Sequence, residues 1–259
     1  GEQVSSEQRA DTFAEDLATV QWRVRPVTLV PDTCAPVCGP LKVKDDAFSP
    51  QELLKALGQL KTGKAVKNDD VPAEALKALA LERGPAFDWI LSFCNLCWTS
   101  KAIPTEWASA SVVMIFKKGD PGACDNYRPI CLLSIADKAF ASMLKQRLLD
   151  AGIEDVLWPS QFGFRRGCST EDAIFIARRR IELARAQRNG RASLLALDWS
   201  KAFDSINIVS LLDALRRAGL PEPFLQIIDG MLRARSYSVE DSGVVSAVHS
   251  QLSGISQGC

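Results

Sequence analysis

The sequence predicts a fold of the mixed α/β (α+β) class in which helices dominate the N-terminal part. Segments with apolar residues three and four positions apart recur, and the first begins at the capping box Ser49-Pro50-Gln51-Glu52. Apolar runs of strand length lie at 111–116 and 193–198. Residues 236–251 surround an Asp-Ser-Gly turn, which predicts a hairpin.

The expected elements follow one another with short polar connections. Residues 1–45 carry a weak helical pattern at 6–20 and then four prolines, so we expect a linker or an extended arm. Helices are expected at 50–60, 72–82, 85–100, 135–150, 170–187, 206–218 and 223–234.

The overall charge gives no sign of a generally basic nucleic-acid binder. The chain of 259 residues has 31 Lys and Arg against 31 Asp and Glu. The charges are unevenly distributed, however, because residues 161–191 hold eight arginines and only three acidic residues. This segment is therefore the place where we expect contacts with phosphate groups.

No apolar run approaches the roughly 20 residues that a membrane span requires, and the N-terminus is polar and acidic. We therefore expect no membrane partner and an intracellular protein of the nucleus or cytoplasm, not a secreted one. Eight scattered cysteines in a chain of this length favour a reducing compartment. A zinc site from Cys34, Cys38, Cys94 and Cys97 is an alternative, but the last two lie in an apolar helical run where buried thiols are common.

The segment Leu194-Leu195-Ala196-Leu197-Asp198 carries the strongest chemical signal. An apolar strand here would present the carboxylate of Asp198 at its end, and hard divalent cations prefer such oxygen ligands. A polar turn, Trp199-Ser200-Lys201-Ala202-Phe203-Asp204, follows before the next helix. A helix cap or turn is the alternative role for a strand-terminal Asp.

This segment resembles the first catalytic motif of reverse transcriptases, in the form used by non-LTR (LINE-type) retrotransposons. Four further segments resemble blocks of that family, in the family's order and spacing. They are Leu60-Lys61-Thr62-Gly63-Lys64-Ala65 with Asp69 and Val71-Pro72-Ala73-Glu74, the stretch 104–134 with Asn126-Tyr127-Arg128-Pro129, Gln161-Phe162-Gly163-Phe164-Arg165-Arg166, and Gly254-Ile255-Ser256-Gln257-Gly258.

The resemblance implies the fingers and part of the palm of a right-hand polymerase. On this basis we expect an N-terminal arm at 1–45, a fingers-like subdomain at 46–192 and a partial palm at 193–259. The implied activity is RNA-directed DNA polymerisation with an RNA template, a DNA primer, dNTPs and Mg²⁺. The resemblance leaves the oligomeric state open.

Two of the family's three metal-binding carboxylates lie in an aromatic-x-Asp-Asp motif, which these 259 residues do not contain. We therefore expect a fragment that is inactive alone and supplies only one ligand of a two-metal site. Two alternatives stay open: a group II intron-type reverse transcriptase or maturase, and a non-catalytic RNA-binding remnant.

The resemblance also assigns roles to single residues. Asp198 would bridge both metal ions, while Lys117, Lys118 and Arg128 would contact the triphosphate; the alternative for the two lysines is a solvated basic turn. Phe203 would close the sugar site against a ribose 2′-hydroxyl, or else pack as a core residue.

Gln257 would lie near the incoming base and the template. Phe162 and Phe164 would stack on a single-stranded template, and Arg165 and Arg166 would contact its phosphates. The alternative is that the arginines of this segment are merely exposed on an amphipathic helix.

Overall fold

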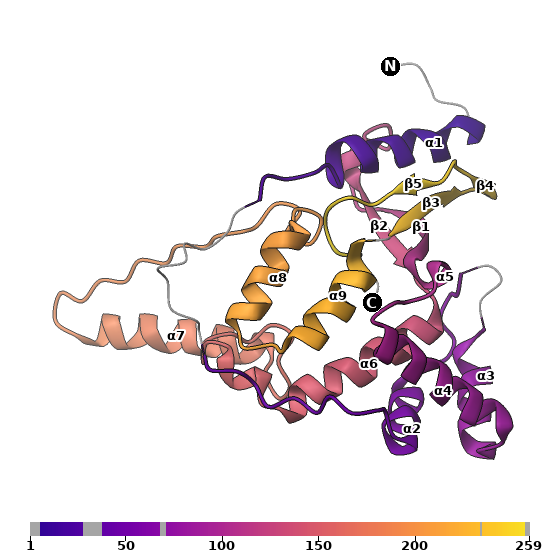
Figure 1. The fold of residues 1–259 in the computed structure, drawn as a ribbon. Helices are drawn as coiled ribbons and strands as arrows, with labels where there is room; N and C mark the ends of the chain where they lie inside the picture. Colours follow the sequence, from indigo (N-terminus) through magenta and orange to yellow (C-terminus); the bar gives the residue numbers. More distant parts are fainter. Residues whose placement is uncertain (1–5, 28–37, 68–70, 234, 257–259) are drawn as a thin grey trace. The chain divides into compact units, whose positions relative to one another are not determined.

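The computed structural model describes residues 6–27, 38–67, 71–233 and 235–256, which form two units (Figure 1). One unit combines the chain up to Ala151 with the chain from Lys201 onward, and the other is Gly152–Ser200. This division differs from the expected boundary at residue 193.

Most of the expected helices are confirmed within one or two residues at each end. The first unit contains α1 (Ser6–Asp16), the π-helix η1 (Leu17–Gln21), α2 (Pro50–Gln59), α3 (Ala73–Glu82), α4 (Pro85–Ser100), α5 (Thr105–Ala108), the 3₁₀ turn η2 (Cys124–Asn126), α6 (Ile135–Asp150), α8 (Ile208–Arg217) and α9 (Glu222–Arg233). The predicted capping box is present, since Ser49 Oγ accepts from the Glu52 amide and Glu52 accepts from the Ser49 amide.

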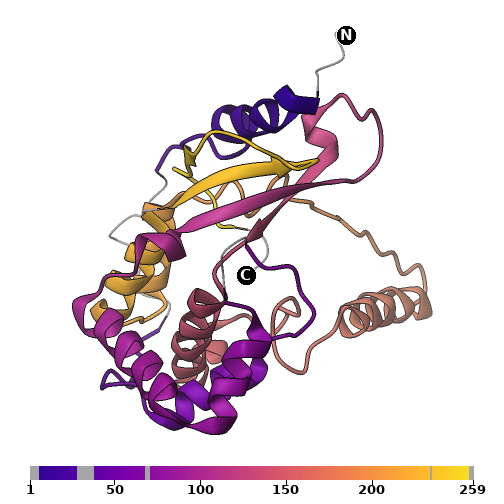
Figure 2. The same cartoon turned by 90° about the vertical axis from the view of Figure 1, so that its right-hand side faces the viewer.

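The sheet of the first unit has the strand order β2-β1-β3-β4, with β5 also paired to β3 (Figure 2). Its strands are β1 (Ser109–Phe116), β2 (Tyr127–Leu132), β3 (Ser236–Asp241), β4 (Val244–Val245) and β5 (His249–Ser250). Strand β1 pairs antiparallel with β2 and parallel with β3. The predicted C-terminal hairpin is confirmed, and its first strand lies beside a strand more than 100 residues earlier in the sequence.

Two apolar clusters hold the first unit together. In one, Phe13, Leu17 and Trp22 pack against β-strand residues including Val112 and Tyr237, so α1 and η1 cover the sheet (Figures 1 and 2). The other cluster lies among α2, α3, α4, α6 and α9. The described N-terminal residues 6–22 are therefore part of the packed unit, whereas we expected an arm or linker.

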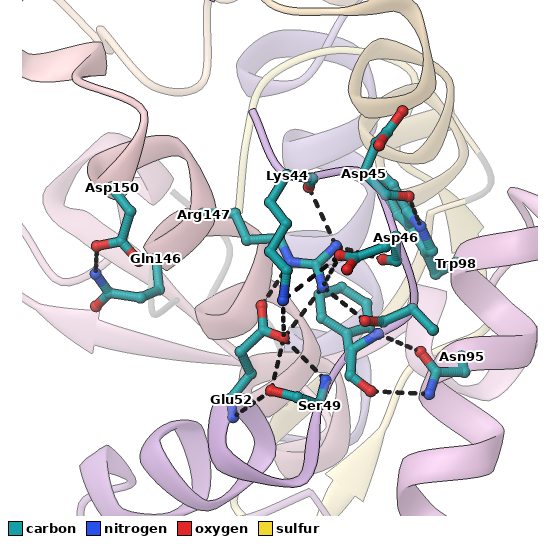
Figure 3. A network of polar contacts seen from close by, with 12 residues as sticks. Lys44, Asp45, Asp46, Ser49, Glu52, Asn95, Trp98, Gln146, Arg147 and Asp150 are labelled. Atoms are coloured by element: carbon teal, nitrogen blue, oxygen red, sulfur yellow. Dashed lines mark hydrogen bonds and ion pairs between the residues drawn. The ribbon is translucent and has the colours of Figure 1, made fainter. Parts of the chain in front are cut away.

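A buried arginine joins α6 to the segment before α2 (Figure 3). The Arg147 guanidinium donates to both carboxylate oxygens of Glu52, at 2.6 and 3.1 Å, and to the backbone carbonyls of Asp46 and Ala47. It also lies 4.1 Å from the centre of the Phe48 ring. Burial raises the pKa of Glu52, but hydrogen bonds from Arg147 and Ser49 outweigh it and bring the pKa to about 2. This polar cluster is fully satisfied and fixes the entry to α2.

The second unit contains the 3₁₀ turn η3 (Ile153–Val156) and α7 (Thr170–Ala186). Ser169 and Asp172 form a capping box at the start of α7. No residue of this helix is buried, and Arg178 and Arg179 pair with Glu182 on its surface.

The predicted strand at 193–198 is wrong for the described structure. Residues 191–199 have no regular secondary structure, and Leu195 and Leu197 are 81% and 76% exposed. A strand needs a neighbouring strand to accept and donate its backbone hydrogen bonds. Among the described residues no strand lies beside this segment, so its apolar pattern has no sheet to join.

Candidate functional site

The predicted triphosphate contacts lie at the tip of the β1–β2 hairpin. The Lys117 amide donates to the Asn126 carbonyl at 2.8 Å and closes the turn after β1. Arg128 on β2 pairs with Ile115 on β1, two residues before Lys117, so the alternation of a hairpin places Lys117 and Arg128 on the same face. Both side chains and that of Lys118 are exposed. The hairpin therefore presents a small basic group to solvent.

An ion pair links this hairpin to the turn that carries Phe203. Lys201 Nζ lies 2.8 Å from Asp125 Oδ1, and this contact lowers the pKa of Asp125. Lys201 has a positive φ of 50°, and its carbonyl accepts from the Ser205 amide at 2.9 Å, which closes the turn. The sequence contains no signal for this ion pair, because the two residues lie 76 positions apart.

The turn carrying Phe203 is joined backbone to backbone to the segment Gly254–Ser256. The Ile255 amide donates to the Phe203 carbonyl at 3.0 Å, and the Gly254 amide donates to the Ile206 carbonyl at 2.8 Å. Phe203 is 40% exposed. The structure thus brings together two of the blocks that we identified in the sequence.

Glycine is required at position 254. Its φ is +77°, and a Cβ built there would lie 2.8 Å from the carbonyl oxygen of Asp204. Any side chain would therefore strain the backbone and push the Phe203 turn away. This explains in physical terms why the block begins with glycine.

The segment 251–256 is also held from the start of β3. Arg235 Nη1 donates to Ser256 Oγ at 2.6 Å, and Ser256 Oγ donates to Gln251 Oε1 at 3.1 Å. The Gln251 amide in turn donates to the Arg235 carbonyl. Gln257 follows this network directly but lies outside the described residues, so its predicted role stays a prediction.

A buried carboxylate faces the same arginine. Burial raises the pKa of Asp137, on the first turn of α6, to about 6, although the positive charges of Arg235 and Lys138 oppose this. Its Oδ1 has no hydrogen-bond partner among the described residues. Asp137 therefore interacts electrostatically with the arginine that holds Ser256, and the sequence did not single it out.

Asp204, which follows Phe203, is buried rather than exposed to a ligand. Only 2% of its surface is accessible, and its Oδ1 accepts from the Trp22 indole Nε1 at 2.9 Å. No motif in the sequence indicates this role for Trp22, which lies 182 residues before Asp204.

Asp198 and the predicted template residues belong to the second unit. Asp198 is exposed within the segment that has no secondary structure. Phe164 is 95% exposed with φ +61°, Phe162 is half-buried, and the Arg166 amide donates to Glu154 at 3.2 Å. Arg165 contacts the Trp158 carbonyl. Phe162, Phe164, Arg165 and Arg166 thus lie close together in sequence on the loops before α7.

No group of three or more His, Cys, Asp or Glu side chains that could hold a metal ion occurs in the part of the chain that the structure describes. Cys94 and Cys97 are buried thiols on α4, and burial together with the neighbouring Cys97 raises the pKa of Cys94 to about 12. Cys34 lies outside the described residues. None of the described helices has the length and apolarity needed to cross a membrane.

Comparisons with known proteins indicate similarity to reverse transcriptases. A sequence model of the family described as reverse transcriptase (RNA-dependent DNA polymerase) matches residues 115–259, more than half of the chain. The chain is 27% identical over 210 residues to the probable RNA-directed DNA polymerase from transposon BS of Drosophila melanogaster, covering 80% of this chain and 23% of that protein. It is 30% identical over 179 residues to the RNA-directed DNA polymerase from mobile element jockey of the same species, covering 66% and 19%.

A third relative extends the match over nearly the whole chain. The transposon TX1 uncharacterized 149 kDa protein of Xenopus laevis is 26% identical over 260 residues, covering 97% of this chain and 19% of that protein. The chain spans less than a quarter of the length of these three relatives.

Proposed function

Because the chain belongs to the reverse transcriptase (RNA-dependent DNA polymerase) family, we propose that it forms the nucleotide- and template-binding part of a non-LTR retrotransposon polymerase that copies RNA into DNA. Its relatives include polymerases of mobile elements of this type. None of these relatives supports the group II intron alternative.

One observation carries the proposal: segments far apart in sequence converge on the Phe203 turn. The Gly254 block is hydrogen-bonded to it, and the β1–β2 hairpin is tied to it through Asp125 and Lys201. A nucleotide site needs both cations for the triphosphate and a wall for the sugar. The hydrogen bonds and the ion pair that join these segments in the first unit support the proposal that they form such a site.

Nucleotide addition is an in-line phosphoryl transfer whose barrier falls through positioning and through neutralisation of charge. Lys117, Lys118 and Arg128 would hold the triphosphate, with Arg128 making the fork-shaped contacts that guanidinium groups form with phosphate. The ring of Phe203 would exclude the 2′-hydroxyl of a ribonucleotide. Gln257 would contact the base or the template.

Enzymes of this family generally use a divalent metal such as Mg²⁺, which neutralises phosphate charge. The described residues do not complete such a site, since Asp198 stands alone on an exposed segment. We propose that Asp198 contributes one ligand once the family's aromatic-x-Asp-Asp hairpin supplies a neighbouring strand to residues 193–198.

Phe162, Phe164, Arg165 and Arg166 would bind single-stranded template RNA by stacking and phosphate contacts. Their proximity on exposed loops supports this role. RNA binding by the chain should weaken as salt rises, and the double change Arg165→Gln and Arg166→Gln should reduce it more than Arg83→Gln, an exposed arginine of the first unit.

The decisive experiment uses the chain continued through an aromatic-x-Asp-Asp segment of the family, which we call the extended protein. Asp198→Ala should abolish dNTP incorporation on an RNA template while the melting temperature stays unchanged. The control is Asp155→Ala, an exposed aspartate of the same unit, which should leave incorporation intact. Incorporation by the Asp198 variant would refute the assignment, and an inactive parent that still binds RNA would favour a non-catalytic remnant.

A further inference from the structure

Asp204 is a buried carboxylate next to Phe203, the residue that we propose as the steric gate against a ribose 2′-hydroxyl. The proposed chemistry does not use Asp204. A carboxylate that is 2% exposed is costly unless donors compensate for the water it has lost. One donor is the indole N–H of Trp22, 2.9 Å away and 182 residues earlier in the chain. The contact therefore connects the N-terminal helical segment directly to the turn that carries the gate.

Trp22 is itself held firmly. Its ring meets the ring of Tyr237 on β3 edge to face, with the centroids 4.6 Å apart and an angle of 86° between the planes. Its backbone amide donates to the Leu17 carbonyl at 2.6 Å, and the Tyr237 hydroxyl donates to the Ala14 carbonyl at 2.9 Å. The indole N–H thus has a fixed direction relative to the sheet.

The other side of the turn is fixed as well, because the Phe203 carbonyl accepts from the Ile255 amide at 3.0 Å. The Phe203 carbonyl belongs to the peptide group that leads to Asp204, whose side chain is held by Trp22. The Ser205 amide also closes the turn on the Lys201 carbonyl, so these contacts together restrict rotation of this peptide and the direction in which Phe203 projects. An aromatic ring that excludes a single 2′-hydroxyl group by steric clash must be held in a well-defined position.

We propose that Trp22 is a positioning residue for sugar selection, which acts on Phe203 through Asp204. This inference rests on the proposed function, and within the N-terminal segment it assigns the role to Trp22 alone. Trp22 does not touch the nucleotide; it holds the peptide from which the gate projects.

The first test measures selectivity in the extended protein. Trp22→Phe keeps an aromatic ring against Tyr237 but removes the N–H donor. The ratio of kcat/KM for dNTP over rNTP should fall roughly fivefold to tenfold, the order expected for losing one buried polar contact in a discriminating pocket. The matched control is Arg9→Gln, which breaks the ion pair of Arg9 with Asp241 at 2.6 Å and so loosens α1, the helix before the Trp22 segment, without touching Asp204.

Arg9→Gln should lower the melting temperature and leave the selectivity ratio unchanged. A second pair of variants approaches the contact from the other side. Asp204→Asn keeps an oxygen that can accept from Trp22 and should keep selectivity, whereas Asp204→Val should lose it as Trp22→Phe does. Equal selectivity in all four variants would overturn the proposal.

The second test does not depend on catalysis. In this chain of 259 residues, amide hydrogen exchange of Ser205 and Ile255 should quicken in Trp22→Phe and not in Arg9→Gln, because only the first variant frees the turn. Equal acceleration in both variants, or none, would show that Trp22 merely supports the fold. If the extended parent protein incorporates no dNTP, the proposed function fails, while the exchange data still decide whether Trp22 fixes the turn.

Discussion

The two halves of the segment 194–204 differ in secondary structure and in packing, although they form one continuous motif. The first half, 194–198, is exposed and has no secondary structure. The second half forms a closed turn, and within it Asp204 is buried against Trp22 while the Phe203 carbonyl is bound by Ile255. The apolar content of the first half is higher, yet it is the half that is not packed.

The difference shows that the availability of hydrogen-bonding partners determines the structure of this segment more than its apolar sequence pattern does. A turn satisfies part of its hydrogen bonding internally, as Ser205 does with Lys201. A strand satisfies none of its backbone groups without a neighbour. The half that needs only a local bond and a few side-chain contacts therefore forms a turn, and the half that needs a neighbouring strand has no regular secondary structure.

The apolar residues of the first half should show the largest effect, because their environment is proposed to change when a neighbouring strand is present. Leu195→Asn together with Leu197→Asn should change the unfolding free energy of this chain by less than about 0.5 kcal/mol, since both side chains are exposed. In the extended protein, where we propose that the segment is a strand, the same pair should cost about 3–5 kcal/mol. Urea unfolding measures both, and equal losses in the two proteins would contradict the comparison.

The second half should be sensitive to its glycine partner. Gly254→Ala should lower the unfolding free energy by about 2–3 kcal/mol, because a positive φ and a close approach to the Asp204 backbone combine. Gly243→Ala is the matched control: its φ is +82°, but nothing lies within 4 Å of the added Cβ, so about 1 kcal/mol is expected. Similar losses at both positions would mean that Gly254 does not hold the turn.

Phe203 tests whether the ordered half acts as a gate. In the extended protein, Phe203→Val should reduce the discrimination between dNTP and rNTP by about 1–2 kcal/mol, chiefly through better use of rNTP. A core phenylalanine would instead show a lower melting temperature with both substrates affected equally. Steady-state kinetics and a thermal melt on one preparation separate the two outcomes.

The smallest effect concerns the Arg147 cluster, which shows how a fully partnered polar group behaves. The pKa of Glu52 is about 2 in the folded chain, below its ordinary value near 4.5, so its charged form stabilises the fold. That stability is complete above pH 4.5 and is lost as the pH falls toward 2. After allowance for solvent screening, the loss should be about 1 kcal/mol.

Denaturant unfolding between pH 5 and pH 2 measures this slope, and Glu52→Gln should flatten it. A slope that survives the substitution would place the titrating group elsewhere. Among the described residues, the exposed segment 191–199 contains no buried ion pair like that of Arg147 and Glu52. The pH dependence therefore reports on the packed part of the molecule and not on this segment.

The helices and the hairpin could be predicted because their signals are local. Capping at Ser49, an apolar face along 135–150, and the Asp-Ser-Gly turn before Val244 each depend on residues a few positions apart. The strand at 193–198 could not be judged in this way. An apolar run shows that a segment can be a strand, but whether it forms one depends on a hydrogen-bonding neighbour that the local sequence does not reveal.

The family and the residue types of the candidate site were determined by the sequence itself. The order and spacing of the blocks around Asp198, Phe203 and Gly254 can be seen without coordinates, and the family match agrees with them. These features depend on which residues occur and how far apart they are along the chain.

Only the tertiary structure decided which of these blocks meet and what holds them. Trp22 on Asp204, Lys201 on Asp125 and Arg235 on Ser256 join residues from 21 to 182 positions apart. Such pairs leave no periodic signal, because their geometry is created when the α1 segment and the hairpins pack on one sheet. A contact of this kind depends on where the backbone brings two side chains, and that position is fixed by the whole fold rather than by either local sequence.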